Sequence, residues 1–277
     1  MKKIRFGFST CPNDTFIFDA LYHKKIDWQG FDFEFVLADV EQLNTLALTQ
    51  QIDITKISYY SYALVADNYI LSDYGSALGK NNGPLVIASE TFSEKDLYKK
   101  TIAIPGIHTT ANLLLSIGFP RATHKIPMLF SEIEQAVIND VADAGLIIHE
   151  SRFTYAAKGL KKIVDFGEWW ESQWQMPLPL GGICISRRFN AREIRKLNAI
   201  IGESVAYAFA RPMESFNFIK QYAQEMTQEV MEKHIALYVN RYTRNLGDEG
   251  KASVEFLFRK AAEINIFVPV NKPIFIQ

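Results

Sequence analysis

The stretch IRFGFSTCPNDTFIFDALY, residues 4–22, contains the pattern that decides the fold. Its opening residues place Ile4, Phe6 and Phe8 on one face of a strand, because side chains alternate across a β-strand. A polar turn follows, and residues 15–22 have the composition of a helix. A strand, a short turn and a helix in this order are typical of α/β proteins.

The same order recurs through the first two thirds of the chain. Apolar or alternating segments predict further strands at residues 31–35, 52–58, 84–89, 101–105, 145–148 and 180–186. Helical periodicity predicts helices at residues 40–50, 108–117 and 131–139, and a tyrosine-rich helix that ends near residue 66. In the helix at 131–139, Ser131 and Glu134 have the spacing of a capping box. Strands that alternate with helices predict an α/β protein with mostly parallel sheets and helices on both faces.

The last third of the chain has a different pattern, with helices and almost no strands. Asn190 and Glu193 can cap the first of these helices. The later helices are expected at residues 213–224, 228–240 and 249–263. Helices that follow an α/β body indicate that the chain returns to cover its first lobe. We find no repeat and no long linker, so the pattern favours two lobes with crossovers near residues 88–96 and 178–186.

Composition excludes several classes of protein. The 277 residues are 48% hydrophobic and 22% charged, and the formal net charge is −1, so no strong field favours nucleic acid or an anionic membrane as a partner. No apolar run approaches the ~20 residues of a membrane helix, and no export signal is recognised. Cys11 and Cys184 are too few for a disulfide framework, which indicates reduced thiols. We therefore expect a cytoplasmic protein that binds a small molecule; the sequence leaves its oligomeric state open.

Polar residues follow the first and third predicted strands. In open parallel sheets, ligands bind beyond the carboxyl ends of the strands. Ser9, Asn13 and Asp14 belong to a turn that leads into a helix, where free N–H groups attract anions or hydroxyls; a simple helix cap is the alternative. Lys56 and Ser58 end the apolar face of the third strand. A lysine there can pair with a carboxylate, or its stem can pack while its head reaches solvent.

Two later stretches have the same placement. Thr109 and Thr110 begin a helix after a strand and Gly106, which suits a carboxylate through N–H groups, hydroxyls and the helix dipole; capping is again the alternative. His149 emerges at the end of the apolar strand at 145–148, where it can act as a general base near neutral pH. An isolated histidine at such a place can equally be satisfied by a backbone group. His108 is expected to frame its turn.

The tryptophans at 169, 170 and 174, followed by a Pro/Gly-rich run at 176–182, could cover a ring-shaped ligand, although hinge packing is favoured. The five histidines are scattered, so no metal cluster is expected. The sequence has no GxGxxG or GxSxG motif and no basic-aromatic strip.

Five of these stretches together resemble the 1,4-dihydroxy-6-naphthoate synthase family. They are SxCPNDTF at 9–16, TKIS at 55–58, PGxHTTA at 105–111, GLIIHESRFTY at 145–155 and PLPLG at 177–181. They occur in order over the whole chain, which makes the resemblance specific. A threonine at residue 10 stands where proline is expected, a change of little consequence.

The resemblance implies a fold, a reaction and a site. The implied fold is that of type II periplasmic binding proteins, with two α/β lobes and a cleft between them; we assign residues 1–90 and 184–277 to the larger lobe and 91–183 to the smaller lobe. The implied reaction belongs to the futalosine route to menaquinone and breaks a carbon–carbon bond of cyclic dehypoxanthine futalosine, without a cofactor.

The resemblance also implies roles for individual residues. His149 is the expected proton acceptor. The substrate-lining residues implied are Lys56, Ile57, Ser58, Thr109 and Thr110. We expect His149 to take a hydroxyl proton and start a retro-aldol-like cleavage, with lobe closure excluding water from the cleft.

Three other functions remain open from the sequence. A solute-binding protein without catalysis would have the same fold, but the missing export signal and the histidine argue against it. Chorismate dehydratase, a sister enzyme of the same pathway, would bind a carboxylate and remove water; the GLIIHE stretch favours the synthase. Nothing in the sequence supports a purely structural protein.

Overall fold

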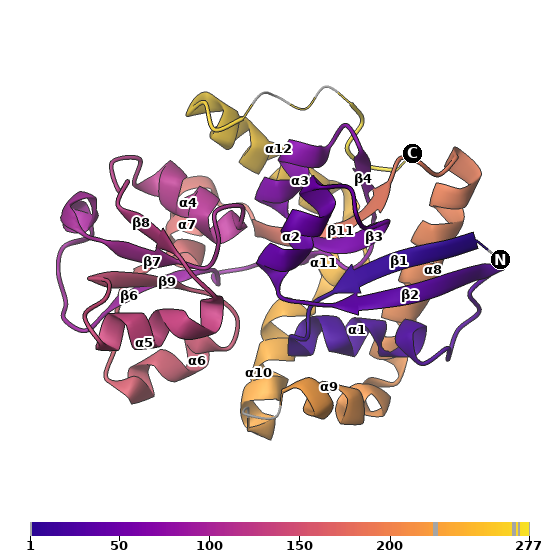
Figure 1. The fold of residues 1–277 in the computed structure, drawn as a ribbon, viewed down its shortest axis with the longest axis horizontal. Coiled ribbons are helices and arrows are strands. Elements are labelled where there is room, and N and C mark those ends of the chain that lie inside the picture. Colours follow the sequence, from indigo (N-terminus) through magenta and orange to yellow (C-terminus); the bar gives the residue numbers. More distant parts are fainter. Residues whose placement is uncertain (1, 224–226, 268–269, 271, 277) are drawn as a thin grey trace. The chain divides into compact units, whose positions relative to one another are not determined.

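The computed structural model describes residues 2–223, 227–267, 270 and 272–276. The chain divides into two compact units. The first unit consists of residues 1–78 and 179–277, and the second unit of residues 79–178. The colours of Figure 1 follow this order, because indigo and orange segments share the first unit and magenta segments form the second.

The first unit is built on a mixed sheet. Its strands are β1 (Lys2–Phe8), β2 (Phe31–Leu37), β3 (Ile54–Ser58), β4 (Tyr69–Leu71), β5 (Ala77–Gly79) and β11 (Leu178–Ser186). The strand order is β2-β1-β3-β11-β4, and β5 pairs with β11. Strand β1 is parallel to β2 and β3, whereas β11 is antiparallel to β3 and β4.

The main core of the first unit lies on one face of this sheet. Ile4, Phe6 and Phe8 are fully buried there, which confirms the alternation predicted for this strand. They pack against α1 (Pro12–Tyr22) and α8 (Ala191–Ala210), with α9 (Phe216–Tyr222) and α10 (Gln228–Tyr238) contributing at the rim. Figure 1 shows α1, α8 and α9 on this side of β1 and β2. The predicted capping box of Asn190 and Glu193 is present at the start of α8.

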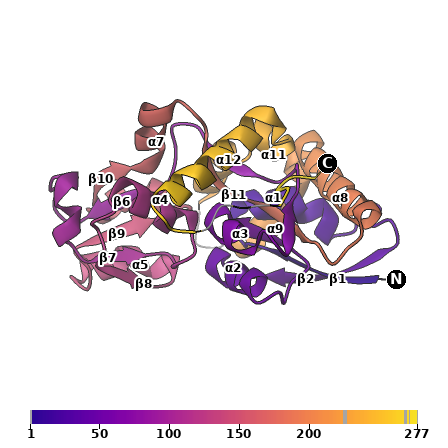
Figure 2. The same ribbon diagram turned by 90° about the horizontal axis from the view of Figure 1, so that it is seen from above.

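The opposite face of the sheet is covered by α2 (Val40–Leu48) and α3 (Tyr59–Val65). Helix α12 (Gly247–Glu263) packs on α3, as Figure 2 shows from above, and the short elements η4 (Pro212–Ser215) and α11 (Arg241–Arg244) complete the unit. A Cβ atom at Gly7 would lie 2.7 Å from Leu43 Cδ2 and 2.5 Å from Ile52 Cδ1. The missing side chain of Gly7 therefore allows α2 to approach the sheet.

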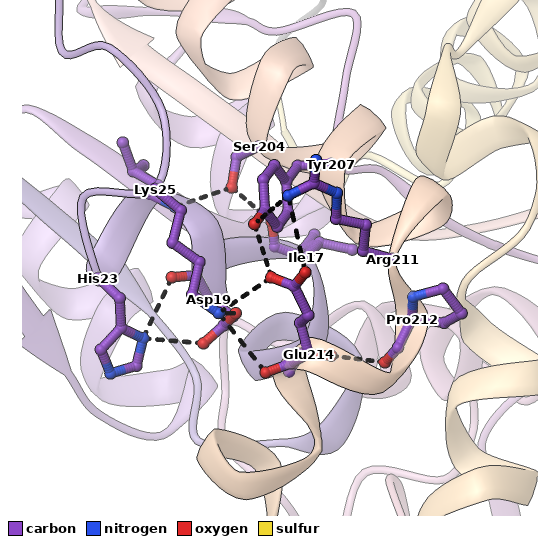
Figure 3. A network of polar contacts seen from close by, with 11 residues as sticks. Ile17, Asp19, His23, Lys25, Ser204, Tyr207, Arg211, Pro212 and Glu214 are labelled. Carbon is purple, nitrogen blue, oxygen red and sulfur yellow. Dashed lines mark hydrogen bonds and ion pairs between the residues drawn. The ribbon is translucent and has the colours of Figure 1, made fainter.

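A polar network joins α1 to η4 beside this core (Figure 3). The buried Asp19 carboxylate accepts from His23 Nδ1 at 2.8 Å and from Lys25 Nζ at 2.6 Å. Lys25 also reaches a carboxylate oxygen of Glu214 at 3.8 Å. The Ser204 hydroxyl donates to the carbonyl oxygen of residue 17 at 2.7 Å. These contacts hold the carboxyl-terminal half of α1 in place. They therefore also fix the orientation of the turn before α1, which belongs to the candidate site.

The second unit contains a five-stranded mixed sheet. Its strands are β6 (Leu85–Ala88), β7 (Ile102–Ile104), β8 (Lys125–Pro127), β9 (Ala144–Ile147) and β10 (Lys161–Asp165), in the order β10-β6-β9-β7-β8. Its helices are η1 (Glu94–Lys99), α4 (Thr110–Gly118), η2 (Phe130–Glu132), α5 (Ile133–Ile138), α6 (Ser151–Thr154), η3 (Tyr155–Lys158) and α7 (Phe166–Trp174). Figure 1 shows α4 and α7 on one side of this sheet and α5 and α6 on the other. The α/β class and the helices on both faces are thus confirmed.

The sheets are mixed, however, where mostly parallel sheets were expected. Strands β6 and β10 pair antiparallel with each other, β6 pairs antiparallel with β9, and β11 pairs antiparallel with β3. Antiparallel neighbours need no crossover helix between them. A hydrophobic run such as β6 or β11 has the same pattern whether the strand pairs parallel or antiparallel. The sequence therefore could not predict the direction of these strands.

One local prediction was wrong, and one expected helix is formed by two short elements. The expected capping box of Ser131 and Glu134 does not form, because Ser131 lies inside η2 and α5 begins at Ile133 without a side-chain cap. Glu134 instead accepts hydrogen bonds from the Ser151 hydroxyl at 3.0 Å and from Lys158 Nζ at 2.8 Å. The helix expected at 213–224 starts as η4 and continues as α9 to Tyr222; residue 224 lies outside the described residues.

Three further observations bear on the predictions made from the sequence. Within the described residues, no helix is both long and apolar enough to cross a membrane. Cys11 and Cys184 are both buried and form no disulfide. Trp170 is fully buried in α7 with its ring centroid 4.4 Å from that of Trp174, so these tryptophans pack within the second unit.

Candidate active site

In the first unit, residues singled out in the sequence meet at one end of the sheet, where β1 and β3 have their carboxyl ends. This end is called the edge of the sheet below. Phe6 of β1 pairs with Ile54 of β3 in a parallel ladder, so both strands end at the same edge. The turn after β1 and the end of β3 therefore lie side by side. Strand β11 starts here too, because Gly181 pairs with Ser58. A Cβ atom at Gly181 would lie 2.8 Å from the carbonyl oxygen of Ile57, so this close approach requires glycine.

The Asp14 carboxylate is the centre of this edge. Its Oδ2 accepts from the Ser9 N–H at 3.2 Å and from the Ser9 hydroxyl at 2.7 Å. Its Oδ1 accepts from Asn13 Nδ2 at 2.7 Å and lies 3.2 Å from Lys56 Nζ. Asp14 is only 1% exposed. Four donors around one buried carboxylate make Asp14 an organiser of the turn, and leave it little capacity to bind a ligand itself.

Lys56 is buried with this carboxylate. Its ammonium group also donates to the carbonyl oxygen of Gly75 at 3.1 Å, and the residue is 7% exposed. Lys56 therefore pairs with a carboxylate, which was one of the two possibilities seen in the sequence. The other possibility, an ammonium group that reaches solvent, does not occur. Asn13 and Asp14 do not cap the helix either, because α1 begins at Pro12 with Cys11 as N-cap and no side-chain cap bond.

Ser58 has a partner that the sequence did not indicate. Its N–H donates to Asn44 Oδ1 at 3.0 Å, and Asn44 Nδ2 donates to the Ser58 hydroxyl at 3.2 Å. Both residues are buried. The Ile57 side chain is fully buried in the core, so only the backbone of Ile57 is suited to contact a ligand. Asn44 lies inside a predicted amphipathic helix, and no pattern marks a polar residue there as part of a site.

In the second unit, three strands end together. Ile102 of β7 pairs in parallel with Lys125 of β8 and with Ala144 of β9. The turn that contains Thr109 and Thr110 follows β7, and His149 follows β9. The carboxyl ends of neighbouring parallel strands thus bring the predicted threonines and the predicted histidine to the same edge of this sheet.

The turn after β7 is a defined structure. Gly106 has φ 125°, a value that only glycine adopts readily. Thr109 is the N-cap of α4: its hydroxyl accepts from the Asn112 N–H at 3.2 Å and donates to the Gly106 carbonyl at 3.0 Å. The capping alternative therefore holds for the Thr109 hydroxyl. Thr110 begins α4, and both threonines are buried. The helix start keeps its partial positive charge, which suits a carboxylate.

His149 has an uncommon backbone conformation. Its φ is 57°, in the left-handed region that residues other than glycine seldom adopt. Its side chain is partly exposed, and the ring of Phe130 meets it edge-on with the centroids 5.0 Å apart. Histidine adopts this region more readily than most residues, and seven other non-glycine residues of the described chain also have a positive φ. Phe130 was not indicated by the sequence, because the three-residue strand β8 before it is too short to be recognised.

The rim of this edge is apolar. Ile107 is 51% exposed and Leu129 is 45% exposed, and they follow the neighbouring strands β7 and β8. Exposed aliphatic side chains beside threonine N–H groups and a histidine suit a ligand with an apolar ring and a carboxylate. No group of three or more metal-ligating side chains is found among the described residues.

The fold defines the class of protein first. The structure is similar to that of the alkanesulfonate-binding protein SsuA from Xanthomonas axonopodis pv. citri bound to MOPS, with a TM-score of 0.72 and 13% identity, over 100% of this chain and 96% of that chain. The likeness shows the fold alone: the chain has the fold of periplasmic binding proteins.

The family follows from closer matches. The model of the menaquinone biosynthesis family matches residues 4–263, and the chain belongs to this family. A relative from Thermus thermophilus, named 1,4-dihydroxy-6-naphthoate synthase, is 41% identical over 276 residues, which cover 100% of both proteins. A crystal structure of a protein from Archaeoglobus fulgidus has a TM-score of 0.90 and 35% identity, over 96% of this chain and 98% of that chain.

Proposed function

We propose that the chain is a 1,4-dihydroxy-6-naphthoate synthase, a cytoplasmic carbon–carbon lyase that converts cyclic dehypoxanthine futalosine to 1,4-dihydroxy-6-naphthoate. The observation that supports this most strongly is the carboxyl end of the sheet in the second unit, where a histidine, an aromatic ring and a helix start with threonines follow three neighbouring strands. The full-length match to a relative of that name supports the same reaction.

The carboxylate of the substrate ring binds at the start of α4 in this proposal. The N–H groups of Thr109 and Thr110 lie in the first turn, where the helix dipole favours negative charge. The Thr109 hydroxyl is already used as a cap, so its contribution is to hold the turn in place. Ile107 and Leu129, both exposed, contact the faces of the ring.

His149 acts as the general base. It takes the proton of a substrate hydroxyl, the oxygen forms a carbonyl, and the adjacent carbon–carbon bond breaks. The electron pair of that bond passes into the ring carbonyl system, and aromatisation makes the step downhill. Phe130 limits the orientations of the imidazole by its edge contact. No cofactor is needed for this redistribution of electrons, and a positioned base contributes ~10²–10⁴-fold in rate.

In the first unit, the proposed substrate contacts lie at the carboxyl end of β3. Lys56 and Ser58 are the proposed contacts, together with the backbone of Ile57. The role of Ser9, Asn13 and Asp14 is indirect. Ser9 and Asn13 donate hydrogen bonds to the Asp14 carboxylate, and this carboxylate pairs with Lys56 and holds it at the end of β3.

The test compares two histidine variants in the second unit. His149→Ala should lower kcat by ~10²–10⁴-fold, whereas His124→Ala, at an exposed position, should keep the wild-type rate. Product is followed by mass spectrometry, and circular dichroism checks that both variants are folded. If His149→Ala retains near-normal turnover, the assignment of the base is wrong. If the wild-type protein leaves cyclic dehypoxanthine futalosine unchanged but dehydrates chorismate, the proposed reaction is wrong.

A further inference from the structure

A chain of hydrogen bonds leads from β8 to the turn after β7. Lys125 Nζ donates to Asn112 Oδ1 at 2.8 Å and to the Ser116 hydroxyl at 2.7 Å. Asn112 Nδ2 in turn donates to the carbonyl oxygen of Ile107 at 2.7 Å, and its backbone N–H donates to the Thr109 hydroxyl. Asn112 therefore joins the lysine to two residues of the turn, Ile107 and Thr109.

The lysine decides which way the Asn112 amide points. An ammonium group has donors only, so the amide oxygen must face it. The amide nitrogen is then directed at the Ile107 carbonyl, which draws that peptide toward α4. Asn112 is 8% exposed, so water is poorly placed to replace either contact.

Among the described residues, no carboxylate forms an ion pair with Lys125. Strand β7 and helix α4, against which it packs, contain no ionisable side chain. Arg121 and His124, in the loop before β8, and His108, in the turn after β7, are the ionisable groups of the neighbouring loops. Burial lowers the pKa of Lys125 to about 8. A partly buried cation beside neutral amide and hydroxyl groups is available to an anion that binds at the start of α4.

We propose that Lys125 and Asn112 are positioning residues for the carboxylate subsite: they hold the turn at 106–110 and supply the positive charge that the substrate carboxylate requires. This rests on the proposed function, because it concerns the same subsite at Thr109 and Thr110. Neither residue touches the reacting bond, so they govern binding of the substrate and leave the chemical step unchanged.

The pH dependence follows from the sign of the charge. Below about pH 8 Lys125 is protonated and favours a bound carboxylate; above it the ammonium loses its proton and the carboxylate binds more weakly. A histidine ordinarily changes charge near pH 6.5, well below this transition. The wild-type Kd for an aromatic carboxylate should therefore rise between pH 7 and 9.5.

Binding of 2-naphthoate, measured by calorimetry from pH 7 to 9.5, tests the proposal with three proteins. Wild type should bind more weakly as pH rises, with a midpoint near 8. Lys125→Met should bind about tenfold more weakly at pH 7 and show no change with pH. Lys125→Arg keeps the charge at every pH, so it should bind like wild type at pH 7 and remain tight at pH 9.5.

Three further variants separate positioning from a general loss of structure. Asn112→Asp keeps the acceptor for Lys125 but removes the donor to the Ile107 carbonyl, so KM should rise with kcat nearly unchanged. Lys161→Met removes an exposed lysine from β10. Strands β10 and β8 are the two outermost strands of this sheet, on opposite sides, so this variant should keep the wild-type Kd, KM and pH profile. His124→Gln should keep the wild-type midpoint near pH 8.

The outcomes distinguish this inference from the proposed reaction. A wild-type Kd that stays constant from pH 7 to 9.5, or a Lys125→Met protein that binds as tightly as wild type, overturns the role of Lys125. If normal product formation accompanies such a result, the proposed reaction survives. If 2-naphthoate binds with the expected dependence on pH and Lys125 but no 1,4-dihydroxy-6-naphthoate forms, the inference stands and the proposed reaction fails.

Discussion

Replacement of Asp14 by asparagine tests the organisation of the first unit most sharply. The two side chains have nearly the same shape, so no cavity forms, but the variant loses the negative charge and turns one acceptor into a donor. Two pairs of donors face this carboxylate: the Ser9 N–H and hydroxyl on one oxygen, and Asn13 and Lys56 on the other. Whichever way the new amide turns, its NH₂ group meets donors.

The expected cost follows from burial. Asp14 is 1% exposed and Lys56 is 7% exposed, so water cannot replace the missing charge. Loss of one partner of a buried ion pair costs about 3–5 kcal/mol; with one amide oxygen still accepting, we expect about 3 kcal/mol. At a slope of about 3 kcal/mol per molar urea, the midpoint of urea unfolding should fall by about 1 M.

The assay is urea unfolding followed by circular dichroism at pH 7, with one control and one rescue. Glu229→Gln removes the carboxylate of an exposed pair with Lys233, whose N···O distance is 2.6 Å; its midpoint should stay close to wild type. The double variant Asp14→Asn with Lys56→Met removes the unpaired cation and should recover part of the loss. The reasoning is refuted if Asp14→Asn unfolds at the same urea concentration as Glu229→Gln.

Two further predictions concern stability and thiol chemistry. Gly145→Ala places a Cβ atom 2.6 Å from Ile133 Cγ2 in the core of the second unit, and should cost about 1–3 kcal/mol; an unchanged urea midpoint would show that α5 moves away freely. Burial raises the pKa of the Cys184 thiol, so at pH 8 it should stay protonated and resist iodoacetamide until urea unfolds the chain, as peptide mass mapping can show; rapid alkylation of the native protein at Cys184 would contradict its burial.

Most of the strands near the site could be predicted from the sequence, because their hydrophobic residues alternate or form continuous apolar runs. Alternating phenylalanines identify β1 and β2, and the apolar run at 145–148 identifies β9, whose observed bounds are Ala144–Ile147. The short strands β4, β5 and β8 were missed, since three residues carry no recognisable period. The direction of β6 and β11 is a property of tertiary pairing that no local pattern encodes.

The candidate site was predictable only in part, for a similar reason. Turn residues after strands are visible in the sequence, and so the stretches with Lys56, Thr109 and His149 could be singled out. Their supporting partners lie within helices or after an unrecognised strand: Asn44 in α2 and Asn112 in α4 occupy positions where polar residues usually face solvent. Only the packing of each unit reveals that these amides are buried and hydrogen-bonded to the site.

The most direct test of the proposed function is turnover by the purified wild-type protein. The chain is mixed with cyclic dehypoxanthine futalosine in the presence of a chelator and without added cofactor, and 1,4-dihydroxy-6-naphthoate is quantified by mass spectrometry over time. We predict many moles of product per mole of protein, lost when His149 is replaced by alanine. Substrate that binds but remains intact after prolonged incubation would contradict the account and indicate a binding protein on the same fold.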